Sequence, residues 1–360
     1  MTSGFRRIII WGLPAFLMAF ISIPSLKIIQ LTDNNFDDKH PVISGDNIIW
    51  QQADGKIISY DMLRDYSKEI GQLKGTSLLS IDGGTLCWYQ KESQGDFIYF
   101  SSTDNSGLYR LNAGGEITLN PQIKNRKLAW CVRTDADYIL CLFNLNSHKT
   151  TRIHLAQTIK PLFCLGSRFL AFSAIENGRQ AVRTLDVRTG KLKTISNPDF
   201  ENGRPFCHGM RVAWQAFDGH DDEIFCYDDY TGYTYRITEN EIDDYAPRLS
   251  DHSLCWLRAT EDDSGIELMD FSSMETTTLM ASLASNRHPA MDNDYVVWVN
   301  GSGNTCRLSM YDIQAQSYQQ IGQYNFSHAK PYLSNHTIVW QGSDGNDDEI
   351  FICRLDSLSN

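Results

Sequence analysis

Aspartates cluster in short turns of this chain, and two of these turns are nearly identical. Residues 218–223 read DGHDDE, and residues 344–349 read DGNDDE. Carboxylate clusters suit hard cations, because Ca²⁺ prefers oxygen ligands. The pattern therefore predicts ligands for a divalent cation, with Ca²⁺ as the first candidate, at Asp218, Asp222, Asp344 and Asp348. The spacing differs from that of an EF-hand loop, and Asp-Gly also favours tight hairpins, so solvated turns are the alternative interpretation.

Three histidines suggest a second kind of metal chemistry. His40, His288 and His328 lie one to three residues before prolines that recur along the chain. Imidazoles that converge can bind a transition metal, although histidines in exposed loops are more common. One alternative function is a polysaccharide lyase or glycosidase that acts on anionic sugars, for which these histidines are the candidate ligands or bases.

Basic residues precede other prolines of the same series. Lys160, Arg204 and Lys330 each stand directly before a proline. Because Arg and Lys donate charge-assisted hydrogen bonds to carboxylates, we expect these three to hold an anionic small ligand, for instance a uronate sugar. Pairing with nearby loop aspartates is the alternative. The sequence contains no G-x-S-x-G nucleophile elbow, and we predict no catalytic residue.

A recurring tryptophan indicates which elements position these residues. Seven of the eight tryptophans follow one another at steps of 38, 42, 84, 42, 42 and 42 residues, and Phe172 stands at the middle of the longest step. Strand-rich units of about 40–45 residues are typical of a β-propeller. The run that ends in each aromatic, such as VAW at 212–214, is apolar without alternation. Such a run predicts a strand that is covered on both faces. The seven are Trp50, Trp88, Trp130, Trp214, Trp256, Trp298 and Trp340.

Each unit predicts four short strands. In residues 205–238 they are PFCH, a strand within GMRVAWQAF, EIFCYD and YTYRIT, bounded by turn residues. The last unit lacks the fourth strand, and the segment Lys27–Leu31 matches the missing one. We therefore predict an all-β domain over residues 26–360, a β-propeller of eight four-stranded blades closed by that N-terminal outer strand. Seven blades is the alternative, if the irregular second unit is not a blade.

The first 25 residues have a different composition. Arg6 and Arg7 precede the apolar run IIIWGLPAFLMAFISI at residues 8–23, which is the pattern of a secretory signal. The run is short for a spanning helix and contains Pro14, so we expect cleavage after Ser25 and a periplasmic or secreted protein. An uncleaved inner-membrane anchor is the alternative, and only residues 8–23 would then contact the membrane.

The repeat also resembles a known family. The pattern P-x-(I/L)-S-x-x-x-(I/V)-x-W, followed by (D/E)-I-(F/Y) and T-G, is clearest in residues 205–238 and visible again in 331–356. It resembles the TolB-like, or WD40-like, propeller repeats of exported bacterial and archaeal proteins. The resemblance implies a propeller with outer-strand closure and an extracytoplasmic location. It implies little about chemistry, because this repeat serves binding proteins and enzymes alike.

Composition limits the classes of partner. A net charge of −12 argues against nucleic acid. The nine cysteines are odd in number and show no disulfide spacing, so we expect mostly buried free thiols. We favour an exported, non-catalytic propeller that binds a protein or a cell-envelope glycan. The alternatives are the lyase or glycosidase and a structural propeller stabilised by Ca²⁺.

Overall fold

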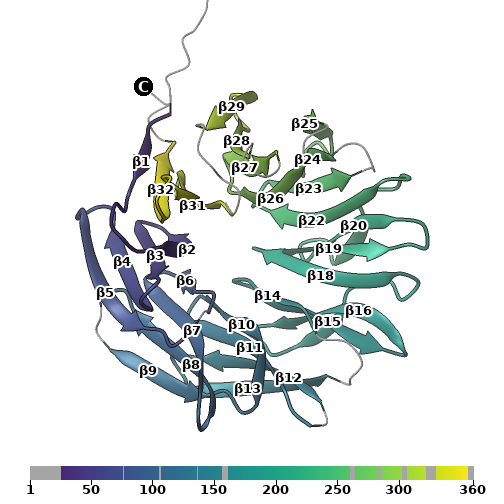
Figure 1. Ribbon diagram of the computed structural model, residues 1–360. Helices are drawn as coiled ribbons and strands as arrows, with labels where there is room; N and C mark the ends of the chain where they lie inside the picture. The colour runs from purple at the N-terminus through teal and green to yellow at the C-terminus, as the bar shows by residue number, and fades with distance from the viewer. Residues whose placement is uncertain are drawn as a thin grey trace, which may run out of the picture.

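The chain forms a ring of antiparallel sheets (Figure 1). The computed structural model describes residues 26–75, 77–104, 107–135, 137–155, 161–259, 264–282, 285–301, 306–321 and 330–355. These residues form eight sheets of four strands each, which confirms the predicted eight-bladed β-propeller, the irregular second blade included. Among them, no helix is long and apolar enough to cross a membrane.

The blades follow one another along the chain, and each runs from an innermost to an outermost strand. The first four are β2 (Asp38–Ser44), β3 (Asn47–Gln52), β4 (Lys56–Asp61) and β5 (Tyr66–Gln72); β6 (Ser80–Asp82), β7 (Thr85–Glu92), β8 (Gly95–Ser102) and β9 (Leu108–Asn112); β10 (Glu116–Lys124), β11 (Lys127–Arg133), β12 (Tyr138–Asn144) and β13 (Lys149–Leu155); and β14 (Phe163–Leu165), β15 (Phe169–Glu176), β16 (Arg179–Asp186) and β17 (Leu192–Thr194). The last four are β18 (Glu201–His208), β19 (Arg211–Phe217), β20 (Asp222–Asp228) and β21 (Tyr233–Arg236); β22 (Asp243–Leu249), β23 (Ser253–Ala259), β24 (Ser264–Asp270) and β25 (Thr276–Ser282); β26 (Asn286–Met291), β27 (Tyr295–Asn300), β28 (Arg307–Asp312) and β29 (Ser317–Ile321); and β30 (Tyr332–Ser334), β31 (Thr337–Ser343), β32 (Asp348–Arg354) and β1 (Ile28–Gln30).

The ring closes by pairing the first described strand with the last. β1 runs antiparallel to β32, with Ile28 opposite Cys353 and Gln30 opposite Phe351. Figure 1 shows this purple strand beside the yellow one. The predicted closing strand, Lys27–Leu31, is thereby confirmed. Because β1 completes the last blade, β32 has no unpaired edge that could recruit another chain.

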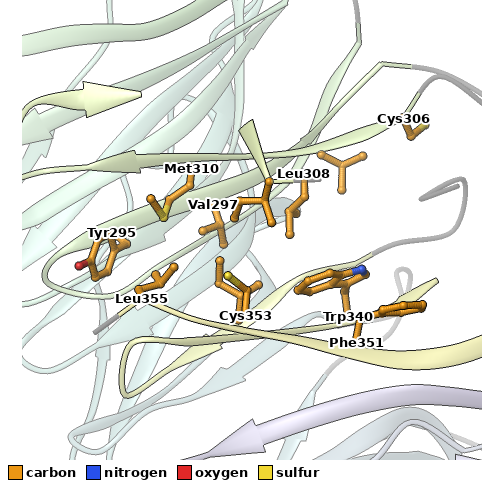
Figure 2. Close-up of a cluster of buried hydrophobic side chains, with 12 residues drawn as sticks. Tyr295, Val297, Cys306, Leu308, Met310, Trp340, Phe351, Cys353 and Leu355 are labelled. Carbon is orange, nitrogen blue, oxygen red and sulfur yellow. The ribbon is translucent and has the colours of Figure 1, made fainter. Parts of the chain in front are cut away.

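Apolar layers between neighbouring blades form the core. Figure 2 shows the layer between the seventh and eighth blades, where Val297 and Leu308 lie against Trp340 and Cys353. The Trp340 indole stacks on the Phe351 ring, with the ring centroids 5.9 Å apart. Each of the seven recurring tryptophans is at most 4% exposed. The apolar run before each tryptophan is therefore explained by burial on both faces of its strand.

Four of the buried indoles are anchored in the same way. Each Nε1–H donates to the side chain twelve residues earlier: Trp50 to Asp38 at 2.9 Å, Trp214 to Asn202 at 2.9 Å, Trp256 to Asp244 at 2.8 Å and Trp298 to Asn286 at 3.1 Å. A buried indole N–H needs such a partner. The bond ties the second strand of each blade to the start of its first strand.

A bulge precedes the recurring proline in these same blades. The residue before the proline has a left-handed backbone, and the strand register slips there: φ is 54° at His40, 49° at Arg204, 54° at Ala246 and 56° at His288. Proline suits a bulge, because it has no N–H to give to the sheet. Bulges of this kind re-aim side chains and are frequent beside binding sites.

The cysteines agree with the prediction of free thiols. All nine are free, and eight of them are buried. Burial raises the pKa of the Cys87 thiol well above its usual range, so a reactive thiolate does not form there at neutral pH.

Candidate functional site

The innermost strands surround a central cavity of about 580 Å³. Its lining comes from seven consecutive blades, from Leu78 beside the second to Leu333 in the eighth, and most of it is apolar. Leu162, Phe206 and Tyr332 are typical of this lining. A cavity of this size, apolar with a few polar groups, is typical of small-molecule sites.

Arg248 brings a positive charge into this apolar channel. Its Nη1 donates to the carbonyl oxygen of Pro247 at 2.8 Å, and its guanidinium carbon lies 5.1 Å from the centroid of the Phe206 ring. Burial lowers the pKa of Arg248, and none of the groups that act against this is a carboxylate. A buried cation without a counter-charge is unfavourable. The channel would therefore stabilise an anionic group that reached Arg248.

Two further basic residues lie where the channel opens. His288 is exposed and contributes to the lining, and burial together with the Lys330, Arg287 and Arg248 cations lowers its pKa. The imidazole is therefore neutral at pH 7. The Lys330 ammonium lies 5.4 Å from the centroid of the Tyr332 ring and pairs with no carboxylate of the described residues. This mouth offers the Lys330 ammonium and a neutral imidazole.

The other residues predicted for these sites are placed differently. Arg204 is exposed and stands beside the lining, next to Pro205, rather than in it. His40 is half-buried, and burial is the main reason that its pKa is lowered. Lys160 and His328 lie outside the described residues. The three-histidine metal site therefore stays a prediction.

Sequence reasoning missed Arg248, although the repeat contains a signal for it. The residue that follows the recurring proline is apolar or uncharged in the other blades that have this proline, and Arg248 is the one charged residue in the series: Val42, Gln122, Leu162, Phe206, Arg248, Ala290 and Tyr332. Comparing the repeats at this place would have singled out Arg248. The sequence does not reveal that it lacks an acidic partner.

The two acidic turns each bring three carboxylates together. One oxygen from each of Asp218, Asp221 and Glu223 lies within 4.8 Å of the other two, and the same holds for Asp33, Asp344 and Glu349. Burial is the main cause that raises the pKa of Asp221, and the charges of Glu223, Asp218 and Asp243 add to it. The turn at 218–223 is therefore not simply a solvated loop, whereas in the other cluster Asp33 and Asp344 are exposed and only Glu349 is buried. Each cluster could hold a cation.

Two predicted ligands turn away from these clusters. Asp222 accepts a hydrogen bond from Gln215 at 2.8 Å, and Asp348 accepts one from Gln341 at 3.0 Å. Asp218 and Asp344 do lie in the clusters, together with buried glutamates that sequence reasoning missed. The signal for Glu223 and Glu349 was their place at the start of a buried strand, where a carboxylate is unusual.

Comparison with solved structures shows the fold. A computationally designed protein, Ika8, is similar over 91% of this chain and 99% of its own, with a TM-score of 0.64 and 13% identity. The β-propeller domain of the Trilobed protease from Pyrococcus furiosus is similar over 81% of this chain and 99% of its own, with a TM-score of 0.57 and 12% identity. An oligogalacturonate lyase in complex with manganese is similar over 93% of this chain and 100% of its own, with a TM-score of 0.56 and 12% identity.

Sequence comparison does not assign the chain to a family. No protein-family model matches the chain, and no curated protein matches it. The structural likeness extends to a designed protein, a protease domain and a lyase, so it supports a β-propeller and no particular activity.

Proposed function

We propose that this protein is a non-catalytic propeller that binds a carboxylate-bearing ligand, such as a uronate unit of a cell-envelope glycan, in its central channel. The observation that carries the proposal is Arg248, a cation that faces no carboxylate of the described residues in a largely apolar cavity. A uronate would supply the carboxylate, and its ring would lie on apolar lining such as Phe206. Lys330 would add a second cation at the mouth.

Calorimetric titration with a digalacturonate, and with a neutral disaccharide of the same size, tests this proposal. We expect the uronate alone to bind, and Arg248→Gln to weaken it by about tenfold or more, because hydrogen bonds between charged groups contribute about 1.5–3 kcal/mol. Arg64→Gln is the matched control, since the Arg64 side chain is 80% exposed and lies at the outer part of the first blade. Equal binding by the two variants would contradict a channel site, and binding of acidic peptides but not uronates would change the ligand class.

The same samples test the enzymatic alternative. A lyase would release unsaturated sugars from an oligouronate when Mn²⁺ is present, and their ultraviolet absorbance would rise with time. His288 lies in the channel lining, so His288→Gln should then abolish this release. Such a result would replace the binding proposal with a catalytic one.

We also propose that the chain belongs among TolB-like repeat proteins and is exported. The repeat pattern and the apolar run at residues 8–23 support this, and residues 1–25 lie outside the described residues. N-terminal sequencing of the protein from fractionated cells tests it. A periplasmic or secreted chain that begins at residue 26 is expected, an intact membrane-bound chain would indicate an anchor, and an intact cytosolic chain would contradict export.

A further inference from the structure

The turn between β19 and β20 gathers three carboxylates, of which two are buried and one is half-buried. Asp218 and Asp221 belong to the turn, Glu223 belongs to β20, and one oxygen of each lies within 4.8 Å of the others. Asp221 is only 6% exposed and Glu223 is fully buried. Like charges so close together in a buried place repel one another strongly. Something must therefore compensate them.

Part of this cluster has unused hydrogen-bonding capacity. In the described part of the chain, neither carboxylate oxygen of Asp221 has a hydrogen-bond partner, and neither does Oε2 of Glu223. The nearby amide of Ile242 donates to Asn240 at 2.7 Å instead. Buried polar groups in proteins are almost always paired. An unpaired carboxylate that points into a group of carboxylates indicates a positively charged ligand.

One guanidinium, that of Arg236, pairs with two carboxylates of the cluster but not with Asp221. Nη2 of Arg236 lies 2.6 Å from Asp218 and 2.8 Å from Glu223. Among the described residues, no cation pairs with Asp221. Three carboxylates and one guanidinium leave an excess of two negative charges, which matches a divalent cation.

We propose that Asp218, Asp221 and Glu223 bind a divalent cation. All of the side-chain donors are oxygens, so the chemistry favours Ca²⁺ or Mg²⁺ over softer metals. This site is separate from the channel, and the inference is independent of the proposed ligand there.

The contacts of Glu223 indicate that the ion would have a structural role. Its Oε1 accepts the amide of Asn240 at 2.9 Å, and the neighbouring Ile224 amide donates to Thr238 at 2.8 Å. Residues 238–242 are the connection from the fifth blade into the sixth. An ion on Glu223 therefore holds the turn of one blade against the connection to the next, and it stabilises the folded ring.

Calorimetric titration of the EDTA-treated full chain with CaCl₂ tests the site in the wild type and in two neighbouring variants. Asp221→Asn alters the cluster, whereas Asp222→Asn alters an adjacent acid that is bonded to Gln215. We expect Asp221→Asn to bind one Ca²⁺ fewer per chain and Asp222→Asn to bind as many as the wild type. The thermal midpoint of the wild type should rise when Ca²⁺ is added, and that of Asp221→Asn should rise less.

Two outcomes would overturn the proposal: a wild-type chain that binds none of Ca²⁺, Mg²⁺ and Mn²⁺, or equal numbers of bound ions in the two variants. A folding defect is distinguished in EDTA. Because Asn has the shape of Asp and removes an unpaired buried charge, Asp221→Asn should melt at or above the wild-type midpoint without metal. Glu223→Gln is the second variant and should lose the same ion.

Discussion

Two junctions of the ring, between blades 5 and 6 and between blades 8 and 1, are built on the same hydrogen bonds. In each, the backbone amide of an asparagine donates to the side chain of a buried glutamate: Asn240 to Glu223 at 2.9 Å and Asn34 to Glu349 at 3.0 Å. In each, a threonine hydroxyl accepts a hydrogen bond from the backbone amide of the residue after the glutamate. Thr238 accepts from Ile224 at 2.8 Å, and Thr32 accepts from Ile350 at 2.9 Å. The first junction joins blades that are consecutive in the chain, and the second closes the ring.

The junctions differ at the last residue of the outer strand. Arg236 lies opposite Phe225 in the pairing of β21 with β20, and Gln30 lies opposite Phe351 in the pairing of β1 with β32. The two residues therefore occupy equivalent places. The arginine pairs with the carboxylates of its turn, whereas the glutamine brings no charge.

The difference shows that the same set of hydrogen bonds can accommodate a buried glutamate whether or not a guanidinium pairs with it. At the closing junction, burial is the main cause that raises the pKa of Glu349, and the charges of Asp38 and Asp347 add to it. Asp33 joins Asp344 and Glu349 in the same cluster. We therefore expect cations from solvent to matter more at the closing junction than at the junction that has Arg236.

Replacing Arg236 with glutamine should have the largest effect, because it gives the first junction the residue of the second. We expect Arg236→Gln to lower the free energy of unfolding in EDTA by about 3 kcal/mol, since Glu223 would stay buried without its guanidinium. Ca²⁺ should restore more stability in this variant than it adds to the wild type. Urea titrations with and without Ca²⁺ measure both effects, and unchanged stability in EDTA would contradict this explanation of the difference.

Asp244 makes the first junction sensitive to pH. Burial raises the pKa of Asp244 from 3.8 to about 6. The folded state then holds a proton that the unfolded state has lost, so this contribution to stability falls as pH rises from about 4 to about 6. At about 1.4 kcal/mol per pKa unit, the loss is about 3 kcal/mol.

Asp244→Asn removes this titration and keeps an oxygen for Trp256, as Asn202 and Asn286 do in neighbouring blades. We expect the difference in unfolding free energy between variant and wild type to shift in favour of the variant between pH 4 and pH 7. Urea titrations in EDTA at several pH values measure it. A difference that is constant with pH would show that Asp244 does not titrate in this window.

Substitutions of Thr32 and Thr238 test how much each junction contributes to stability. Thr32 accepts the Ile350 amide at 2.9 Å and also donates to Glu349, whereas Thr238 accepts the Ile224 amide. We expect Thr32→Val to destabilise by about 2 kcal/mol and Thr238→Val by about 1 kcal/mol, because each leaves a buried amide unpaired. Hydrogen exchange should show faster opening of β1 in Thr32→Val alone. Equal exchange in both variants would mean that β1 is as secure as an outer strand within a continuous blade.

The reverse exchange should have the smallest effect. Gln30→Arg would place a guanidinium beside Asp344 and Glu349, as Arg236 stands beside Asp218 and Glu223. We expect stability in EDTA to rise by about 1 kcal/mol or less, because Asp344 is exposed and water screens its charge. Affinity for Ca²⁺ at this junction should fall. Calorimetry would count against the comparison if Gln30→Arg bound Ca²⁺ as tightly as the wild type.

The blades themselves could be predicted from the chain, because their determinants are local and repeated. A tryptophan that returns with one period after an apolar run reports a strand covered on both faces, whatever its neighbours are. Lys27–Leu31 was recognisable as the closing strand because it matches an outer strand elsewhere in the repeat. These patterns favoured eight blades over seven, and the structure decided the count, because the irregular second unit also forms a four-stranded sheet.

The candidate sites depended on the tertiary structure. Asp221 and Asp222 are adjacent, yet one lies in a buried cluster and the other bonds to Gln215, because successive residues point in opposite directions where a turn enters a strand. Arg248 was visible as a charged residue in an apolar series, but its lack of a carboxylate partner in the described residues follows from groups that other blades bring into the channel. Sequence determined the repeated strands because periodicity is a local property, whereas the balance of charge at each site was decided by segments that meet only in the closed ring.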